Sequence, residues 1–170
     1  FIHVSKPRKR VLKDNEVRAI WKALGAGVEV SERMALLLKL CLLTGQRESE
    51  CAGAQLSEFT LGTANPRWLI PASRMKRKER DQYVPLVPEA VAVIEEAKAL
   101  GTREGYLFPA DLDKAKLIEG KSGKLERKKP RTPHINRESV SRAMARLTKE
   151  LKINDAHGHD FRKALTTWIR

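Results

Sequence analysis

The chain has 170 residues, with 34 Lys and Arg against 21 Asp and Glu, and its formal net charge is +13. A hydrophobic fraction of 41% excludes a disordered basic tail, and the length is sufficient for one domain with its own core. A folded, strongly basic domain favours a polyanion as its partner, most often nucleic acid, although such a charge can also serve solubility alone.

The sequence also restricts the compartment. Cys41 and Cys51 lie in apolar helical segments, which predicts small core side chains in a reducing compartment and no disulfide framework. No stretch is apolar for long enough to cross a membrane, and no signal peptide is visible. We therefore expect a cytoplasmic, nucleoid-associated protein without membrane contact.

Two helices are predicted in the first quarter of the chain. Asp14 can cap the first, whose apolar residues recur at helical spacing as far as a stop at Gly25. Ser31 opens the second, in which residues 34–43 are apolar on almost every face. A helix of that composition belongs at the centre of a core.

The middle of the chain contains three short runs of β-favouring residues, AQLSEFTLG, RWLIPAS and DQYVPLVP, separated by turn-like segments. Three further helices are expected: one from Pro88 to Gly101, one capped by Asn136, and one from about Asp160. The predicted fold is mainly α with a small three-stranded antiparallel β-sheet.

Two segments are rich in basic residues and show no periodic pattern. KPRKRVLK (6–13) has the composition of a linker, and KSGKLERKKPR (121–131) is expected to be a loop with six basic side chains. Either could follow a phosphate backbone, and either could equally be a solvated surface. We expect residues 1–13 to form a basic linker and residues 14–170 to form the folded domain.

The stretch LLTGQRESE places an arginine and acidic residues at the end of the most hydrophobic helix. Arg47 would have a rigid base at the edge of the core, so that its guanidinium could project from it. Glu50 lies one helical turn further on and can reach back to hold Arg47. An ordinary ion pair without a function would have the same spacing.

The segment PASRMKRKERDQYVPL (71–86) has two strand-like runs around a basic tip. Such a tip can enter a DNA groove or place one ammonium group beside a phosphate, although charged hairpin ends are also a common solubility device. The basic residues of this segment are Arg74, Lys76, Arg77, Lys78 and Arg80.

The segment HGHDFRKALTTW (157–168) opens the last predicted helix. His159 and Arg162 would share a face turned away from the apolar side, and the free N–H groups of a helix N-terminus suit a phosphate. A capping role without a function is the alternative for His159. His157 and His159 form an HxH pair, but we expect no metal site.

Together these motifs resemble, in their order, the catalytic domain of a tyrosine recombinase, most closely the phage and genomic-island integrases. The resemblance rests on LLTGQRESE, a basic hairpin ending in YVPL, YLFP at 106–109 and HDFR, and it covers residues 11–170. The mainly α family fold with a small sheet agrees with the elements predicted above. The resemblance also implies an N-terminal core-binding domain, which residues 1–13 would join to the catalytic domain.

The resemblance implies site-specific DNA recombination or integration. In that reaction a tyrosine attacks a phosphodiester, leaving a 3′-phosphotyrosine and a free 5′-hydroxyl, and no metal or other cofactor takes part. Fixed cations must therefore meet the developing negative charge. The residues of this chain that match the catalytic positions of the family are Arg47, Lys76, His159 and Arg162.

Each of these matches has a chemical role. The two arginines, Arg47 and Arg162, can each hold two phosphate oxygens, and Glu50 matches the acid that orients the first arginine. His159 suits assistance in proton transfer. Lys76 best matches the lysine that protonates the leaving 5′-oxygen, and Lys78 is the other candidate for that role.

The nucleophile of the family has no match here. It follows HxxR by a few dozen residues, whereas this chain ends eight residues after Arg162, and we interpret Tyr83 and Tyr106 as structural. We expect this fragment alone to be inactive in cleavage. Its partner would be double-stranded DNA, on which the family predicts a tetramer, with a monomer expected for the fragment. The expected DNA contacts are Arg74, Arg77, Lys78, Arg80, Lys128, Lys129 and Arg131.

Two other interpretations stay open. The same fold could serve a non-catalytic DNA-binding or regulatory protein, or an unrelated nucleic-acid binder, RNA included, could carry these motifs by chance. A type IB topoisomerase shares the chemistry, but the small size and the TGQR and HDFR contexts argue against it. The sequence specifies neither the attachment site nor the direction of recombination.

Overall fold

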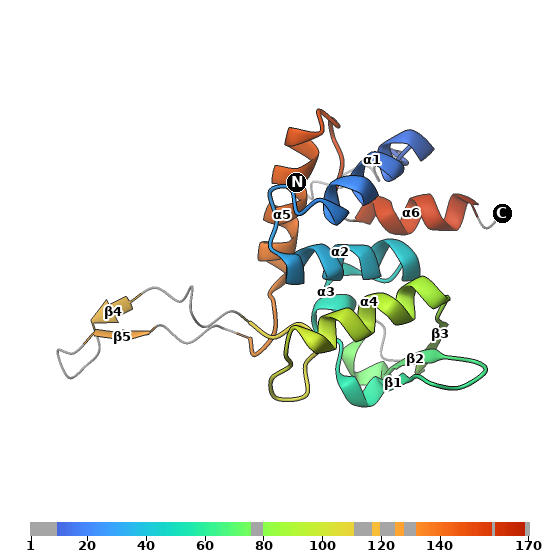
Figure 1. Ribbon diagram of the computed structural model, residues 1–170, viewed down its shortest axis with the longest axis vertical. Coiled ribbons are helices and arrows are strands. Elements are labelled where there is room, and N and C mark those ends of the chain that lie inside the picture. The colour runs from blue at the N-terminus through green and yellow to red at the C-terminus, as the bar shows by residue number, and fades with distance from the viewer. Residues whose placement is uncertain are drawn as a thin grey trace, which may run out of the picture.

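The computed structural model describes residues 10–75, 80–110, 117–119, 125–127, 132–157 and 159–168. They form a helical body with a small sheet at its edge, which confirms the predicted fold class (Figure 1). The α-helices are α1 (Asp14–Gly25), α2 (Glu32–Thr44), α3 (Glu48–Ala52), α4 (Pro88–Ala99), α5 (Arg137–Glu150) and α6 (His159–Trp168). The strands are β1 (Phe59–Thr60), β2 (Arg67–Ile70), β3 (Gln82–Pro85), β4 (Leu117–Glu119) and β5 (Leu125–Arg127), and two 3₁₀ turns are η1 (Leu56–Glu58) and η2 (Ala72–Arg74).

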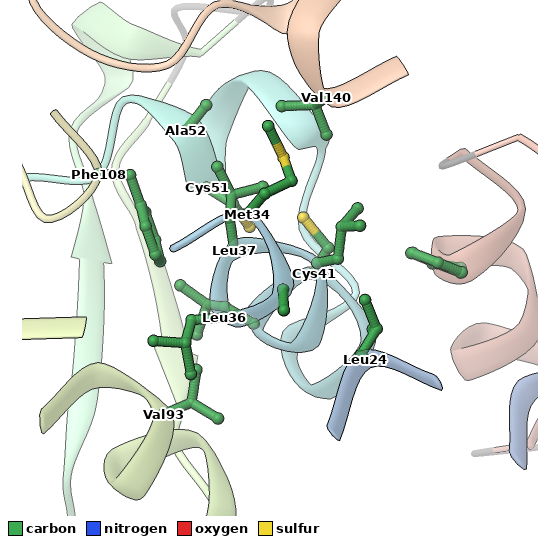
Figure 2. Packing of buried hydrophobic residues seen from close by; sticks show 14 of the residues in the cluster. Leu24, Met34, Leu36, Leu37, Cys41, Cys51, Ala52, Val93, Phe108 and Val140 are labelled. Carbon is green, nitrogen blue, oxygen red and sulfur yellow. The ribbon is translucent and has the colours of Figure 1, made fainter. Parts of the chain in front are cut away.

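Helix α2 is the centre of the fold, as its composition predicted. It packs against α1, α3, α4, α5 and α6, and Leu37, Leu38 and Leu40 have no exposed surface. Figure 2 shows Leu37 and Cys41 of this helix among apolar side chains that come from several other elements. Burial on most of its faces fixes α2 firmly in space, and its C-terminal end leads into the candidate site.

The strands β1, β2 and β3 form an antiparallel sheet in that order. Trp68 pairs with Val84 across β2 and β3, and both side chains are buried on the inner face. Tyr83 alternates to the outer face, where it is exposed and lies 5.8 Å from the guanidinium of Arg67. The segment that connects β2 to β3 is closed beside the strand ends by the Asp81 carboxylate, which accepts a hydrogen bond from the backbone N–H of Ala72 (2.9 Å).

The YLFP motif joins α3 to the segment that precedes α5. Leu107 N donates to Ala54 O, and Ile135 N donates to Phe108 O, each at 2.9 Å. Leu107 and Phe108 are completely buried. This segment therefore connects the end of α3 with the residues that lead into α5 through backbone hydrogen bonds.

The segment expected to be a loop at 121–131 contains a strand. Leu125–Arg127 pairs antiparallel with Leu117–Glu119, and this β4–β5 ribbon extends away from the helical body (Figure 1). Paired strands satisfy each other's backbone groups without a core.

The start of α1 also differs from the prediction. Lys13, not Asp14, is the N-cap, because the Glu16 carboxylate accepts the Lys13 backbone N–H (2.8 Å) and so satisfies the helix start. Leu12 is 2% exposed, and Arg10 pairs with Glu16 at 2.8 Å. Residues 10–13, which were expected in the linker, are thus attached to the domain.

Candidate functional site

The junction between α2 and α3 forms the base of the candidate site. Gly45 ends α2 with a left-handed φ of 63°, a conformation that costs glycine little, and its N–H donates to Cys41 O (2.9 Å). The Gln46 side chain donates to Thr44 O (3.1 Å) and accepts from Gln82 Nε2 of β3 (3.2 Å). The chain that leads into Arg47 is therefore fixed both to α2 and to the sheet.

Arg47 and Glu50 form the ion pair predicted from their spacing. Arg47 Nη1 lies 2.7 Å from Glu50 Oε1, and the backbone N–H of Arg47 donates to Glu50 Oε2 (2.9 Å). The Glu50 side chain is 2% exposed, whereas that of Arg47 is 41% exposed. One edge of the guanidinium is thus held by a buried carboxylate, and the remainder faces solvent, where it can contact an anion.

Helix α6 brings a second arginine to the same junction. Arg162 Nη1 donates to the carbonyl oxygen of Gly45 (3.1 Å), two residues before Arg47. Phe161 and Ala164 anchor the helix in the core. Leu165 lies so close to Gly45 that a Cβ at Gly45 would be 2.6 Å from Leu165 Cδ2. Glycine at this position therefore permits both the left-handed turn and the approach of α6.

Arg74 is directed into the protein. Its guanidinium donates to Gly53 O (2.5 Å), Glu50 O (3.3 Å) and Glu58 Oε2 (2.8 Å), and Arg74 Nε lies 2.7 Å from Glu58 Oε1. Only 18% of the side chain is exposed. These contacts are with α3 and η1, so Arg74 has a place in the structure different from the hairpin-tip position expected for a DNA contact.

The structure describes only some of the other predicted site residues. His159 is the first residue of α6, and its side chain lies outside the described part of the chain. Arg80 is exposed. The remaining predicted residues lie outside the described ranges: Lys76, Arg77, Lys78, Lys128, Lys129 and Arg131.

Glu48 connects α3 electrostatically to α5 and to the start of α6. Its burial raises the pKa of the carboxyl, while Arg137, Ser141 and His157 act in the lowering direction. The Ser141 hydroxyl donates to Glu48 Oε2 (3.4 Å). Asp160 in turn accepts the backbone N–H of His157 (3.0 Å) and so caps the start of α6. Carboxylates therefore hold the segments on either side of the two arginines.

The cysteines are small core side chains, as predicted. Cys41 and Cys51 are free and buried, and hydrogen bonding with Cys51 together with burial raises the pKa of the Cys41 thiol well above its usual range. Within the described residues, no group of three or more His, Cys, Asp or Glu could hold a metal ion. None of the described helices has the length and apolar character needed to span a membrane.

Sequence reasoning missed two side chains that organise the site. Glu58 accepts from Trp68 Nε1 (2.9 Å) as well as from Arg74, and Gln82 holds Gln46. All three interactions join residues that are ten or more positions apart in the sequence. No helical or strand periodicity indicates such pairs, since periodicity reports only which face of an element is buried.

Comparisons with known proteins agree on one family. A model of the phage integrase family matches residues 10–170. Over 85 residues the chain is 34% identical to prophage integrase IntA of Escherichia coli (strain K12). The matched region covers 50% of this chain and 19% of IntA.

Solved structures show the same fold. The XerH site-specific recombinase bound to difH substrate is similar with a TM-score of 0.66 at 15% identity, covering 94% of this chain and 42% of that one. A Tn1549 transposon integrase in complex with transposon right end DNA has a TM-score of 0.68 at 14% identity, covering 97% and 54%. The chain therefore spans about a fifth of IntA and about half of these structures.

Proposed function

The chain belongs to the phage integrase family, and we propose that it cleaves and rejoins double-stranded DNA at specific sites through a 3′-phosphotyrosine intermediate. Its fold is the tyrosine recombinase catalytic-domain fold predicted from the sequence. The observation that carries the proposal is the junction at Gly45. There Arg47 is held by buried Glu50 with its outer edge exposed, and Arg162 is anchored two residues away.

In this proposal the two arginines bind the scissile phosphate. The non-bridging oxygens gain negative charge as the nucleophile attacks, and planar guanidinium groups can donate to both. Because Glu50 already orients Arg47, little reorganisation is needed when the phosphate arrives, which is the condition for strong electrostatic stabilisation. Arg162 would approach the same phosphate from α6.

The remaining roles follow the family motifs. Lys76 donates a proton to the leaving 5′-oxygen, with Lys78 as the other candidate, and His159 assists proton transfer from the nucleophile. The two tyrosines of the chain lie elsewhere: Tyr83 is in β3 against Arg67, and the ring of Tyr106, in the YLFP motif, packs against His134 at 5.1 Å. We propose that the nucleophile is a tyrosine other than these two.

Residues 14–170 would act as the catalytic domain and residues 1–13 as a basic linker to a core-binding domain, with residues 10–13 attached to the catalytic domain. The net charge of +13 supports binding to the DNA backbone. The proposed backbone contacts are Arg77, Lys78, Arg80, Lys128, Lys129 and Arg131. A tetramer on DNA, and a monomer for residues 1–170 alone, follow as part of the same proposal.

The test uses the native protein that contains this chain and nicked DNA duplexes of randomised sequence. Strands that remain attached to protein after SDS treatment are recovered, and the linked peptide is identified by mass spectrometry. Arg47→Lys should reduce the covalent complex by about 10²–10³-fold, because the charge remains but the bidentate fork is lost. DNA affinity should stay within about threefold, since an isolated phosphate contact contributes little to total affinity.

A matched control is Arg33→Lys. The Arg33 side chain is likewise held by acceptors of the protein, the carbonyl oxygens of Gly101 (2.6 Å) and Leu100 (2.8 Å), but at the end of α4. It should leave the covalent complex unchanged. Cleavage by the Arg47→Lys variant at the parent rate would show that Arg47 is not part of the active site.

The alternative is a non-catalytic DNA-binding or regulatory protein with this fold, which the net charge of +13 would support equally. It predicts DNA binding by the native protein without any covalent complex. The same experiment therefore separates the two functions.

A further inference from the structure

We infer that Arg74 and Glu58 form a positioning pair that fixes the short helix α3 against the sheet and thereby aims Arg47 through Glu50. The inference rests on the proposed function of Arg47. It also assigns Arg74 a role different from the DNA contact expected from its place in a basic segment.

Helix α3 needs external support. It has five residues, and an isolated helix of that length is not stable in water. Its N-terminal end is held by the Glu50 carboxylate, which accepts the Arg47 N–H. Packing against α2 and α5 holds one side of it, and its orientation also depends on what binds its C-terminal carbonyl groups.

Arg74 supplies that support. Its two terminal nitrogens donate to the carbonyl oxygens of Gly53 (2.5 Å) and Glu50 (3.3 Å), at the C-terminal end of α3. A cation at this end is also favourable to the helix dipole. The Glu50 backbone thus contacts Arg74 while the Glu50 side chain holds Arg47, so one residue connects the two guanidinium groups.

Glu58 holds Arg74 in place. Its carboxylate is 5% exposed and contacts Arg74 through both oxygens, at 2.7 and 2.8 Å. Glu58 Oε2 also accepts from Trp68 Nε1, and Trp68 is completely buried in β2. The pair consequently ties α3 to the rigid centre of the sheet.

Gly53 provides the space for this contact. A Cβ at Gly53 would lie 2.7 Å from Arg74 Nη1. The φ of Gly53 is −91°, which alanine adopts without strain. Gly53→Ala would therefore displace the guanidinium while leaving its charge in the protein.

The experiment measures single-turnover cleavage at saturating protein in the native protein, on the DNA recovered in the selection above. Arg74→Met and Gly53→Ala should each slow cleavage about tenfold or more, because small errors in the position of a catalytic group are costly. Arg74→Lys should recover part of the rate. DNA affinity and its salt dependence should not change.

Two controls separate positioning from general destabilisation. Arg33→Met removes an arginine that binds two backbone carbonyls at the end of α4, and it should leave cleavage unchanged even if it lowers the melting temperature. A double-mutant cycle should show that Arg74→Met has less effect on cleavage when Glu50→Gln is already present, because both act on Arg47.

Several outcomes would overturn the inference. One is parent-like cleavage by Gly53→Ala. Another is that the effects of Arg74→Met and Glu50→Gln on the cleavage rate are strictly additive in free energy in the double-mutant cycle. A third is a loss of DNA affinity in Arg74→Met with a salt slope lower by about one, which would mark Arg74 as a phosphate contact. If the parent protein forms no covalent complex with DNA, the proposed function itself is wrong. If Arg74→Met cleaves at the parent rate while Arg47→Lys does not cleave, only this inference is wrong.

Discussion

Arginine–carboxylate pairs of nearly equal length occur in two regions of the molecule that differ in burial. At the α2–α3 junction and the adjoining sheet, the carboxylates of Glu50 and Glu58 are 2% and 5% exposed, and their arginines lie 2.7 Å away. Along α1, Glu16 is 17% exposed and Asp14 is 61% exposed, with arginines at 2.8 and 2.7 Å.

The comparison shows that the surroundings of an ion pair, rather than its length, decide what it does. A buried carboxylate that loses its partner cannot return to water, so it holds that partner in one orientation. An exposed carboxylate exchanges its partner for water at little cost. Buried acids can therefore fix the orientation of an arginine side chain, whereas the acids of α1 adjust the stability of a helix start.

The largest effect is expected for Glu58→Ala. It removes the acceptor of the buried Trp68 Nε1 and the carboxylate partner of Arg74, whose charge then has only carbonyl acceptors. We expect a loss of about 3–5 kcal/mol in the free energy of unfolding. Urea denaturation measures it. Glu58→Gln, which keeps an acceptor and the side-chain volume, should cost less. A loss below about 1 kcal/mol for Glu58→Ala would show that burial does not set the strength of this pair.

Glu50→Ala should cost less, about 2 kcal/mol. The change removes the acceptor of the Arg47 N–H and one guanidinium contact, but the exposed Arg47 side chain can be solvated again. Urea denaturation gives the stability, and the covalent-complex assay on the native protein should show a loss of cleavage far larger than 2 kcal/mol of instability could produce. Cleavage that falls only with the folded fraction would contradict a positioning role for Glu50.

The sequence predicted α1, α2, α4, α5, α6, the three-stranded sheet and the Arg47–Glu50 pair, because each depends on local spacing. It predicted neither the short helix α3 nor the strands β4 and β5. The apolar faces of α2 and the i, i+3 interval of Arg47 and Glu50 are visible in any window of a few residues. The partners of Arg74 could not be found that way. Its basic neighbours suggested a DNA contact, whereas Glu58 is sixteen residues away and meets it only because β1 pairs with β2.

Glu16→Gln should have a smaller, pH-dependent effect. Partial burial acts to raise the pKa of Glu16, but the Lys13 N–H and Arg10 outweigh it and lower that pKa. The charged form therefore stabilises the fold above the ordinary glutamate pKa of about 4.3, and this contribution is lost as the pH falls through the lowered value. We expect a loss of about 1 kcal/mol at pH 7 that shrinks in acid. Urea denaturation at several pH values tests this. A loss of stability that grows in acid would contradict a lowered pKa of Glu16 in the folded protein.

The smallest effect is expected for the exposed pair of Arg18 and Asp14, spaced i, i+4 at 2.7 Å. Asp14 also lies at the start of α1, where a negative charge favours the helix dipole, so single substitutions mix two effects. A double-mutant cycle with Arg18→Gln and Asp14→Asn isolates the pair, and its coupling should be about 0.3 kcal/mol at low salt and near zero in 1 M salt. A coupling as large as the cost of Glu50→Ala, at the same separation, would mean that length rather than burial sets the strength of these pairs.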